Sequence, residues 1–335
     1  MDDFVRRVQN ITIGGRYHLQ RKLGPGSFGK VYLGLDADSG NEVAIKLEHC
    51  NVGPSLLEEE ASIYQALTGK PGFPKVYWSG QREDFMALIF ELLGPDLEDL
   101  FRYCGNQFSL KTTLMLADQL LRRLEVLHSR NYLHRDIKPE NFLLGMQQQG
   151  NTVYMTDLGL AKYDHPDRRS FKSPPSHAAT TRPPQLLGTC RYASIKGHLG
   201  SAQSRRDDLE ALGYMLVYFF RGKLPWQGLK AKRDAKYLQY VHELPDEDVP
   251  DYQGLRKMFD KLFREQGFER DNVFDWTIRE FQRLEHDVQE PLASKDVDKR
   301  RAEDAPKPLI SDAAGDQGST SKEEMIFLTR IGEDQ

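Results

Sequence analysis

The hydrophobic pattern of this chain changes once, near Gly94 and Pro95, and this change limits the possible folds more than any other feature. Before it, alternating and short apolar segments bounded by turn residues predict strands of an antiparallel sheet. The predicted strands cover residues 17–23, 30–35, 42–47, 73–79 and 85–92. One helix is predicted among them, at about residues 56–67.

After Gly94 and Pro95, apolar residues recur at steps of three and four, which is the spacing of one buried helical face. The first such series is Leu110, Leu114, Ala117, Leu121 and Leu124. Further helices are predicted at residues 205–220, 253–266 and 277–288. The first of these three is apolar on most sides, so we expect it to be central. A strand-rich part followed by a helix-rich part predicts an α+β fold of two lobes.

Composition limits the classes of partner. The 335 residues include 46 basic and 50 acidic side chains, and the net charge of -4 argues against a general attraction to nucleic acid or anionic membranes. No apolar run approaches the roughly 20 residues that a membrane-spanning helix needs. Three cysteines, an odd and sparse set, favour a reducing compartment. We therefore expect a cytoplasmic protein with no nucleic-acid or membrane partner.

A glycine-rich segment, residues 24–29, lies between two predicted strands. Glycines allow backbone amides to approach phosphate oxygens without a side-chain clash. Taken alone, the segment fits an ordinary glycine-rich hairpin better. Lys46 follows on the next apolar strand, where a lysine normally extends into solvent. In a phosphate site it would instead neutralise the α- and β-phosphates of a nucleotide.

The most specific motif is residues 134–141, His-Arg-Asp-Ile-Lys-Pro-Glu-Asn, followed downstream by Asp157. Phosphoryl transfer needs a carboxylate at the attacking hydroxyl, oxygen ligands for Mg²⁺ and a cation near the transferred group. Asp136 supplies the first, Asn141 and Asp157 the second, and Lys138 the third. A charged surface loop would have to produce all four at this spacing by chance.

On these motifs the chain resembles the eukaryotic protein kinases over about residues 17–280, and more narrowly the casein kinase I branch. The segments that carry the narrower resemblance are residues 92–101, 188–195, 204–210, 224–230 and 273–276. The resemblance implies a serine/threonine kinase that uses ATP and Mg²⁺. The domains implied are an N-terminal extension (1–16), a kinase domain (17–285, with lobes 17–91 and 95–285) and a flexible charged tail (286–335).

The resemblance also assigns roles to single residues. Lys46 would pair with Glu60, which its spacing from Tyr64 favours over the neighbouring Glu58 and Glu59. The implied catalytic residues are Asp136, Lys138, Lys46 and Glu60, and the implied metal ligands are Asn141 and Asp157. The implied nucleotide contacts are Leu23, Gly24, Gly26, Ser27, Phe28, Gly29, Val31, Ala44, Lys46, Phe90, Glu91 and Leu93. Among these, Phe90 is the gatekeeper position and residues 91–93 form the hinge that binds adenine.

Arg191, Gly222 and Lys230 match the positions where the family binds an anion beside the substrate groove. This pocket predicts protein substrates with acidic or phosphorylated residues before the target serine or threonine. His134 and Asp208 would have structural roles in the catalytic loop. We expect a monomer. The basic residues at 230–236 could also direct nuclear import, although such short runs are more often solvated surface.

The chain departs from the family pattern in several places. Leu158 stands where phenylalanine is usual, Lys196 stands where the branch has asparagine, and residues 163–187 form a longer segment than usual. After Glu243 a stretch that includes one helix is missing, so part of the floor of the C-lobe should be uncovered. The missing stretch and Leu158 leave a catalytically weak pseudokinase or scaffold as the alternative. A small-molecule kinase is a third possibility, but it would not need the substrate-groove motifs.

Overall fold

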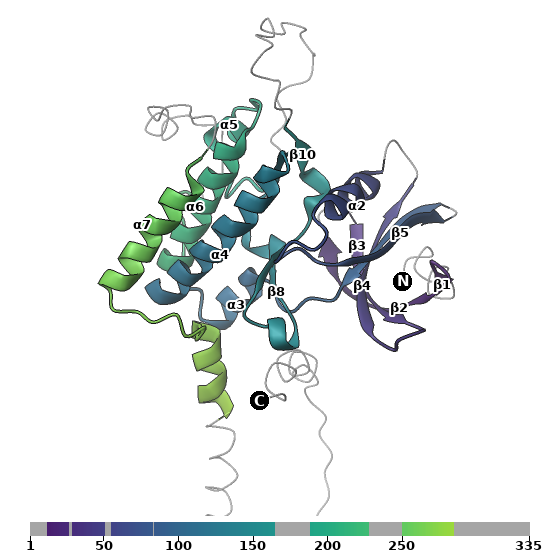
Figure 1. Ribbon diagram of the computed structural model, residues 1–335, viewed down its shortest axis with the longest axis horizontal. Coiled ribbons are helices and arrows are strands. Elements are labelled where there is room, and N and C mark those ends of the chain that lie inside the picture. The colour runs from purple at the N-terminus through teal and green to yellow at the C-terminus, as the bar shows by residue number, and fades with distance from the viewer. Residues whose placement is uncertain are drawn as a thin grey trace, which may run out of the picture.

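The computed structural model describes residues 12–26, 29–50, 55–82, 84–164, 188–227 and 250–284. A strand-rich lobe lies beside a helix-rich lobe, in the order that the hydrophobic pattern predicts (Figure 1). The α+β two-lobed fold is therefore confirmed. Within the described residues, no helix is both long enough and apolar enough to cross a membrane.

The N-lobe is built on an antiparallel sheet of six strands in the order β1-β2-β3-β4-β6-β5. The strands are β1 (Thr12–Ile13), β2 (Tyr17–Gly26), β3 (Gly29–Asp36), β4 (Glu42–His49), β5 (Val76–Arg82) and β6 (Phe85–Glu91). The sheet begins before the predicted domain start at Tyr17, because β1 pairs with β2. β5 begins at Val76 and not at residue 73, and Pro74 in the predicted first half cannot donate a ladder hydrogen bond.

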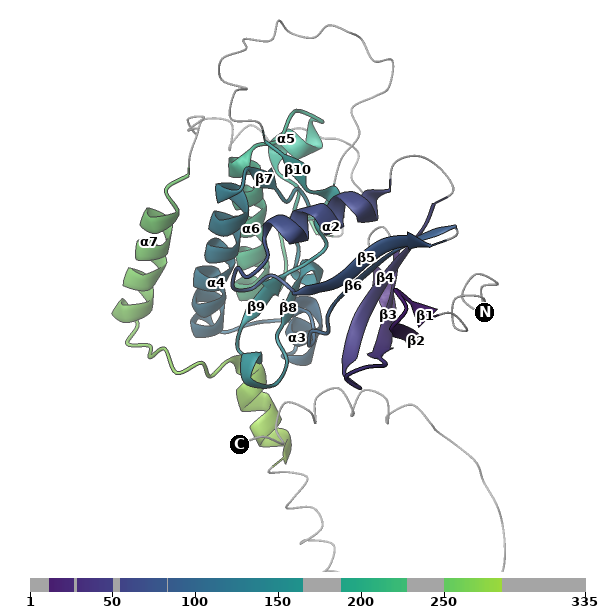
Figure 2. The same ribbon diagram turned by 45° about the vertical axis from the view of Figure 1, so that its right-hand side comes forward.

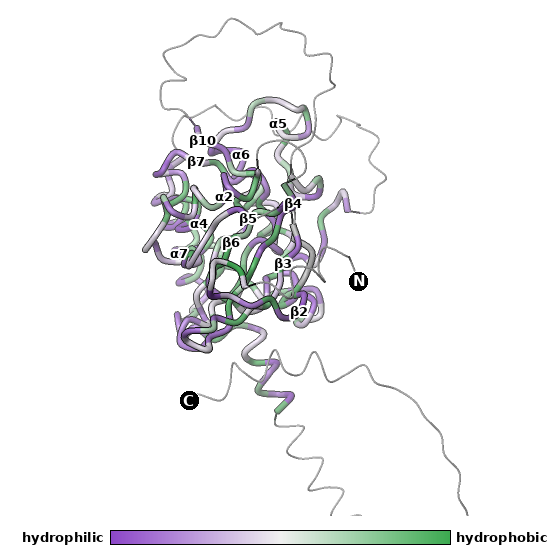
Figure 3. Tube along the Cα trace, turned by 90° about the vertical axis from the view of Figure 1, so that its right-hand side faces the viewer, coloured by the Kyte–Doolittle hydropathy of each residue, from purple (hydrophilic) through white to green (hydrophobic). Residues whose placement is uncertain are grey.

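The two faces of this sheet bury different sets of side chains. One face holds its own apolar cluster, which includes Tyr32, Ile45 and Ile89. The other face, with Leu88, joins the main core of the molecule. Helix α2 (Leu56–Ala66) packs on this second face and lies between the sheet and the C-lobe (Figure 2). β6 is hydrophobic along most of its length, as a central strand buried on both faces should be (Figure 3).

The C-lobe is helical. Its helices are α3 (Leu97–Tyr103), α4 (Leu110–Ser129), α5 (Ile195–His198), α6 (Arg205–Arg221) and α7 (Tyr252–Glu265), and residues 275–284 are also helical. The predicted face of α4 is buried at Leu114, Ala117, Leu121 and Leu124. Asp96 caps the start of α3 by accepting the N–H of Asp99 at 2.8 Å, but this short helix was not predicted from the sequence.

Helix α6 is less enclosed than its composition predicts. Asp207 and Asp208 at its N-terminal end are buried, whereas Val217 and Phe220 near its C-terminal end are each 43% exposed. An uncovered part of the C-lobe is what the missing stretch after Glu243 leads us to expect. Residues 228–249, where that stretch would lie, are outside the described residues, as is the predicted tail at 286–335.

Candidate active site

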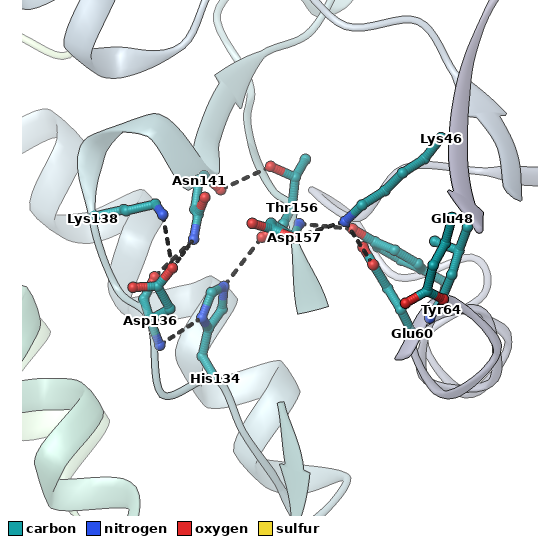
Figure 4. A network of polar contacts seen from close by, with 11 residues as sticks. Lys46, Glu48, Glu60, Tyr64, His134, Asp136, Lys138, Asn141, Thr156 and Asp157 are labelled. Atoms are coloured by element: carbon teal, nitrogen blue, oxygen red, sulfur yellow. Dashed lines mark hydrogen bonds and ion pairs between the residues drawn. The ribbon is translucent and has the colours of Figure 1, made fainter. Parts of the chain in front are cut away.

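Two short strand pairs bring the motif at 134–141 beside Asp157. β7 (Tyr132–Leu133) pairs with β10 (Lys162–Tyr163), and β8 (Phe142–Leu144) pairs with β9 (Val153–Met155). Each pair joins a strand flanking the motif to a strand flanking Asp157. The backbone N–H of Thr156 also donates to the carbonyl of Asn141 at 2.9 Å. The motif and Asp157 therefore meet between the lobes, where Lys46 approaches from the sheet (Figure 4).

Asp136 is the centre of the first polar cluster. One of its carboxylate oxygens accepts hydrogen bonds from the N–H and the hydroxyl of Thr189, at 2.7 and 2.8 Å. The other accepts from Lys138 Nζ at 2.8 Å and from Asn141 Nδ2 at 3.3 Å. Asp136 is only 5% exposed, so these donors replace the water that would otherwise solvate the charge. Three of these residues come from the motif itself, and Thr189 comes from the segment before α5.

Asp208 holds the backbone of the loop in place from the N-terminal end of α6. Its two carboxylate oxygens accept the N–H groups of His134 and Arg135, both at 2.8 Å. The ring of His128, on α4, lies 2.7 Å from the same carboxylate. Burial opposes the charge on Asp208, but the bond from His128 and the backbone donors keep its pKa below the ordinary value. The structural role expected for Asp208 is thus visible in its contacts.

His134 is fully buried and bonded on both sides of its ring. Its Nδ1 lies 3.3 Å from the backbone N–H of Asp136, for which it is the acceptor, and its Nε2 lies 3.2 Å from the carbonyl of Thr156. A neutral imidazole with the proton on Nε2 meets both requirements. The ring therefore links the Asp136 segment to the residue before Asp157, which is the structural role expected for it.

Lys46 is the centre of the second polar cluster. Its Nζ lies 2.7 Å from Glu60 Oε2 and 2.8 Å from Asp157 Oδ1, and Glu60, not Glu58 or Glu59, is its partner on α2. Burial opposes the charge on Lys46, but the two carboxylates raise its pKa above the ordinary value. Burial raises the pKa of Glu60, and Lys46 opposes that rise. The cluster joins a strand, a helix and the Asp157 segment.

Four of the predicted nucleotide contacts share one face of the sheet. Val31 pairs with Lys46 across β3 and β4, and Ala44 pairs with Phe90 across β4 and β6. Cross-strand partners lie on the same face, and so do residues two apart on one strand. Val31, Ala44, Lys46 and Phe90 therefore all face the C-lobe. Leu23, partly buried on β2, lies on the strand beside Val31.

The glycine-rich segment is only partly described. Gly24 and Gly26 end β2 and Gly29 begins β3, with Gly26 paired to Gly29, so the segment is the turn of a hairpin. Ser27 and Phe28 lie outside the described residues. The hairpin geometry agrees with both interpretations of this segment, and the position of Lys46 on the next strand favours the phosphate site.

The predicted hinge links β6 to the C-lobe. The N–H of Glu91 donates to the carbonyl of Lys75 at 2.8 Å, so this amide is already bonded within the N-lobe. Leu93 is buried, and the N–H of Gly94 donates to the carbonyl of Leu144 at 2.8 Å. The chain is thus fixed on either side of residues 92 and 93, and the adenine-binding role of this hinge stays a prediction.

The predicted anion pocket is described only in part. The guanidinium of Arg191 lies over the rings of Tyr192 and Tyr218, at 5.8 and 5.7 Å from their centroids. Tyr218 is one turn before Gly222, which ends α6 with a φ of 80°. Lys230 lies outside the described residues, so its predicted approach to Arg191 stays a prediction.

Two residues that the sequence did not single out take part in the site. Thr189 donates twice to Asp136, and the hydroxyl of Tyr64 accepts the N–H of Asp157 at 3.1 Å. Thr189 lies within the segment 188–195 that carries the family resemblance, and Tyr64 served only to choose Glu60 by spacing. Both contacts join segments that lie far apart in the chain, so no local sequence pattern indicates them.

The oxygen ligands in the site suit Mg²⁺, which prefers oxygen and keeps several waters. The amide nitrogen of Asn141 donates to the backbone carbonyl of Asp136 at 2.8 Å, so the amide oxygen is the arm that can act as a ligand. The other candidate ligand is the carboxylate of Asp157. Among the described residues there is no group of three or more His, Cys, Asp or Glu side chains that could hold a metal alone. A metal held by Asn141 and Asp157 would need further oxygen ligands from water or from a bound phosphate.

Residues 17–270 match the protein kinase domain, which covers both lobes and includes both polar clusters. Members of this family generally use ATP and Mg²⁺, which agrees with the oxygen ligands at Asn141 and Asp157. The chain belongs to the protein kinase family.

Proposed function

We propose that this protein is an active serine/threonine kinase that transfers the γ-phosphoryl group of ATP to protein substrates. The observation that carries the proposal is that both polar clusters are complete and adjacent. Asp136 is held by Lys138, Asn141 and Thr189, and Lys46 joins Glu60 to Asp157. A binding module or scaffold has no need for all of these buried charges, since each is costly to bury without a partner.

Asp136 would orient the substrate hydroxyl and accept its proton. The hydroxyl oxygen then forms a bond to the γ-phosphorus, the bond from that phosphorus to the β–γ bridging oxygen breaks, and ADP leaves with those electrons. Lys138, 2.8 Å from Asp136, is placed to balance charge on the transferred group. Asp136 already accepts hydrogen bonds from four donors. The substrate hydroxyl would therefore have to displace one of these donors or bond the same carboxylate oxygen as one of them.

Asn141 and Asp157 would hold Mg²⁺, which offsets the negative charge of the β- and γ-phosphates when bound. Lys46 would contact the α- and β-phosphates, with Glu60 fixing its position. Val31, Ala44 and Phe90 would enclose the adenine on the sheet side, with Leu23 and residues 91–93 at the edge. The glycines at 24, 26 and 29 would cover the phosphates through their backbone.

For the substrate we propose a protein with acidic or phosphorylated residues before the target serine or threonine. Arg191 supports this, because a guanidinium stacked over two tyrosine rings is fixed in position and matches phosphate geometry. Lys230 would supply the second cation. The casein kinase I assignment rests on the segments at 92–101, 188–195, 204–210, 224–230 and 273–276. We also propose that the protein is a cytoplasmic monomer.

The pseudokinase alternative has less support from the described residues. Leu158 is 1% exposed and belongs to the main core, so leucine fills the place where phenylalanine is usual. None of the polar residues of the two clusters is replaced. The remaining reason for the alternative is the missing stretch after Glu243, which falls outside the described residues.

A transfer assay with radiolabelled ATP tests this function. The full chain, with Mg²⁺ and casein, should label serine or threonine and leave tyrosine unlabelled, and EDTA should stop the reaction. Peptides with a phosphoserine before the target should have a higher kcat/KM than unprimed ones, and the double variant Arg191→Ala/Lys230→Ala should lower that ratio. No transfer to any protein substrate would contradict the kinase proposal, and an unchanged ratio would remove the anion pocket from it.

A further inference from the structure

Helix α2 is attached to the segment that begins at Asp157 by two side chains on one helical face. The hydroxyl of Tyr64 accepts the backbone N–H of Asp157 at 3.1 Å. Glu60 bonds Lys46 Nζ at 2.7 Å, and Lys46 in turn bonds the Asp157 carboxylate at 2.8 Å. Residues four apart lie one above the other on a helix. One face of α2 therefore contacts this segment directly through Tyr64 and, by way of Lys46, through Glu60, and Figure 4 shows Tyr64 and Glu60 side by side below Lys46.

The bond from Asp157 to Tyr64 supports an unusual backbone. Asp157 has φ 58° and ψ 62°, in the left-handed region that is uncommon outside glycine, although aspartate adopts it more readily than most residues. Tyr64 is 3% exposed, so solvent water cannot readily take the place of its hydroxyl oxygen as the hydrogen-bond acceptor. A buried N–H that loses its acceptor is expensive. Without the hydroxyl, Asp157 loses a hydrogen bond that favours its left-handed conformation over other backbone conformations.

The same contact closes a ring of interactions around Lys46. Lys46 bonds both Glu60 and Asp157, while Tyr64, from the same helix as Glu60, bonds the backbone of Asp157. On its other side the Tyr64 ring stacks with Phe90, with centroids 6.5 Å apart and planes at 15°. An outward shift of α2 would therefore break the Lys46 pair and the Asp157 contact together.

We propose that Tyr64 is a positioning residue for Asp157: its hydroxyl fixes the backbone from which the Asp157 carboxylate is presented to the metal and nucleotide. Asp157 would there act as the metal ligand of the proposed function. The inference rests on the proposed function for the identity of that ligand, but the contact itself can be tested without nucleotide.

The first test is hydrogen exchange of the full chain without nucleotide. Tyr64→Phe keeps the ring and removes the acceptor, so the amide of Asp157 should exchange at least about tenfold faster. The matched control is Tyr103→Phe, which removes a hydroxyl bonded to Glu280 at 2.7 Å in the C-lobe. The control should leave exchange at Asp157 unchanged. An unchanged exchange rate in Tyr64→Phe would overturn the inference.

The second test is the affinity for a fluorescent ATP analogue with Mg²⁺ and with EDTA. Tyr64→Phe should weaken binding about tenfold with Mg²⁺ and less than about twofold without it. In the Asp157→Ala background it should add no further loss. An equal change in both conditions would overturn the inference, since Tyr64 would then act on the nucleotide pocket as a whole.

The wild type separates this inference from the proposed function. If the wild type gains no affinity from Mg²⁺, the proposed metal site itself is wrong. If Mg²⁺ raises the nucleotide affinity of the wild type and of Tyr64→Phe by the same factor, only the role of Tyr64 is wrong.

Discussion

The two polar clusters of the site differ in how they are held. The Asp136 cluster draws its partners from one loop and from Thr189, and Asp208 of α6 fixes the loop backbone, so everything it needs lies within the C-lobe. The Lys46 cluster takes one residue from β4, one from α2 and one from the segment after β9. The first cluster requires a folded C-lobe, whereas the second also requires that two lobes and a helix stay in register.

This difference has a consequence for activity. A carboxylate held within one rigid loop keeps its geometry when the lobes move, while a pair that spans lobes is lost as soon as α2 moves outward. We therefore expect variants of Asp136 itself to affect chemistry with nucleotide binding intact. Variants of the Lys46 cluster should affect nucleotide binding and chemistry together.

The largest expected effect is that of Asp157→Ala. It removes a proposed metal ligand and one of the two partners of Lys46, so Mg²⁺-dependent turnover should fall by roughly 10³-fold or more. The exposed Asp99→Ala is a suitable control on α3. Steady-state kcat/KM with Mg²⁺·ATP is the measurement, and a fall of less than about tenfold would mean that Asp157 is not a ligand of the reacting nucleotide.

Asp208→Asn should damage the C-lobe cluster through the fold. An amide in place of the carboxylate turns an NH₂ group toward a donor and removes the charge that His128 and two backbone N–H groups solvate. Breaking such a buried network costs about 3–5 kcal/mol, which corresponds to a fall in Tm of about 10 °C for a domain of this size. Thermal unfolding followed by circular dichroism measures it, with Asp99→Asn as control. A Tm within about 2 °C of wild type would show that the loop does not depend on Asp208.

The stability and the turnover of the protein should depend on pH through Glu60 of the Lys46 cluster. Burial raises the pKa of Glu60 above its ordinary value of 4.5, so Glu60 takes up a proton in the folded protein before it would in the unfolded chain. As pH falls toward that raised pKa, the folded state binds this proton more tightly, so the contribution of Glu60 to stability rises. Turnover should fall over the same window, because Lys46 loses a charged partner.

Profiles of kcat/KM and Tm against pH for wild type and Glu60→Gln test this pair of opposite trends. The glutamine variant should have lower activity throughout and a flatter acidic limb in both profiles. Identical acidic limbs in the two proteins would assign the effect to another group.

The smallest effect on the natural reaction is expected at Phe90. Its ring shares the sheet face of Ala44 and Lys46 and stacks on Tyr64, so it should close the pocket behind the adenine. Phe90→Gly should accept ATP analogues enlarged on the adenine while losing less than about tenfold in kcat/KM for ATP. Equal inhibition of wild type and variant by a bulky analogue would place the gatekeeper elsewhere.

Much of the site could be predicted because its residues lie in short motifs. The spacing within 134–141 identified Asp136, Lys138 and Asn141, and the structure brings them together with Asp157. Thr189 could not be found in this way. It is 53 residues from Asp136, and its contact depends on how the segment before α5 folds back over the loop.

The fold shows the same division between local and distant causes. Long periodic segments such as α4 were predicted well, whereas α3, with seven residues, is too short to show a helical period. The exposure of Val217 and Phe220 on α6 could not be predicted from the helix itself. An apolar helix face indicates that something normally covers it, but the pattern of the helix does not say whether this chain supplies the cover.

The most direct test of the proposed separate roles of the two clusters is the variant Asp136→Asn. Its nucleotide affinity and its single-turnover rate of phosphoryl transfer are measured in the same preparation. Because Asp136 belongs to the C-lobe cluster, its loss should leave the Kd for Mg²⁺·ATP within about twofold and lower the transfer rate by about 10²–10⁴-fold. Transfer at the wild-type rate would contradict the kinase assignment. A loss of affinity as large as the loss of rate would contradict the separation of the two clusters.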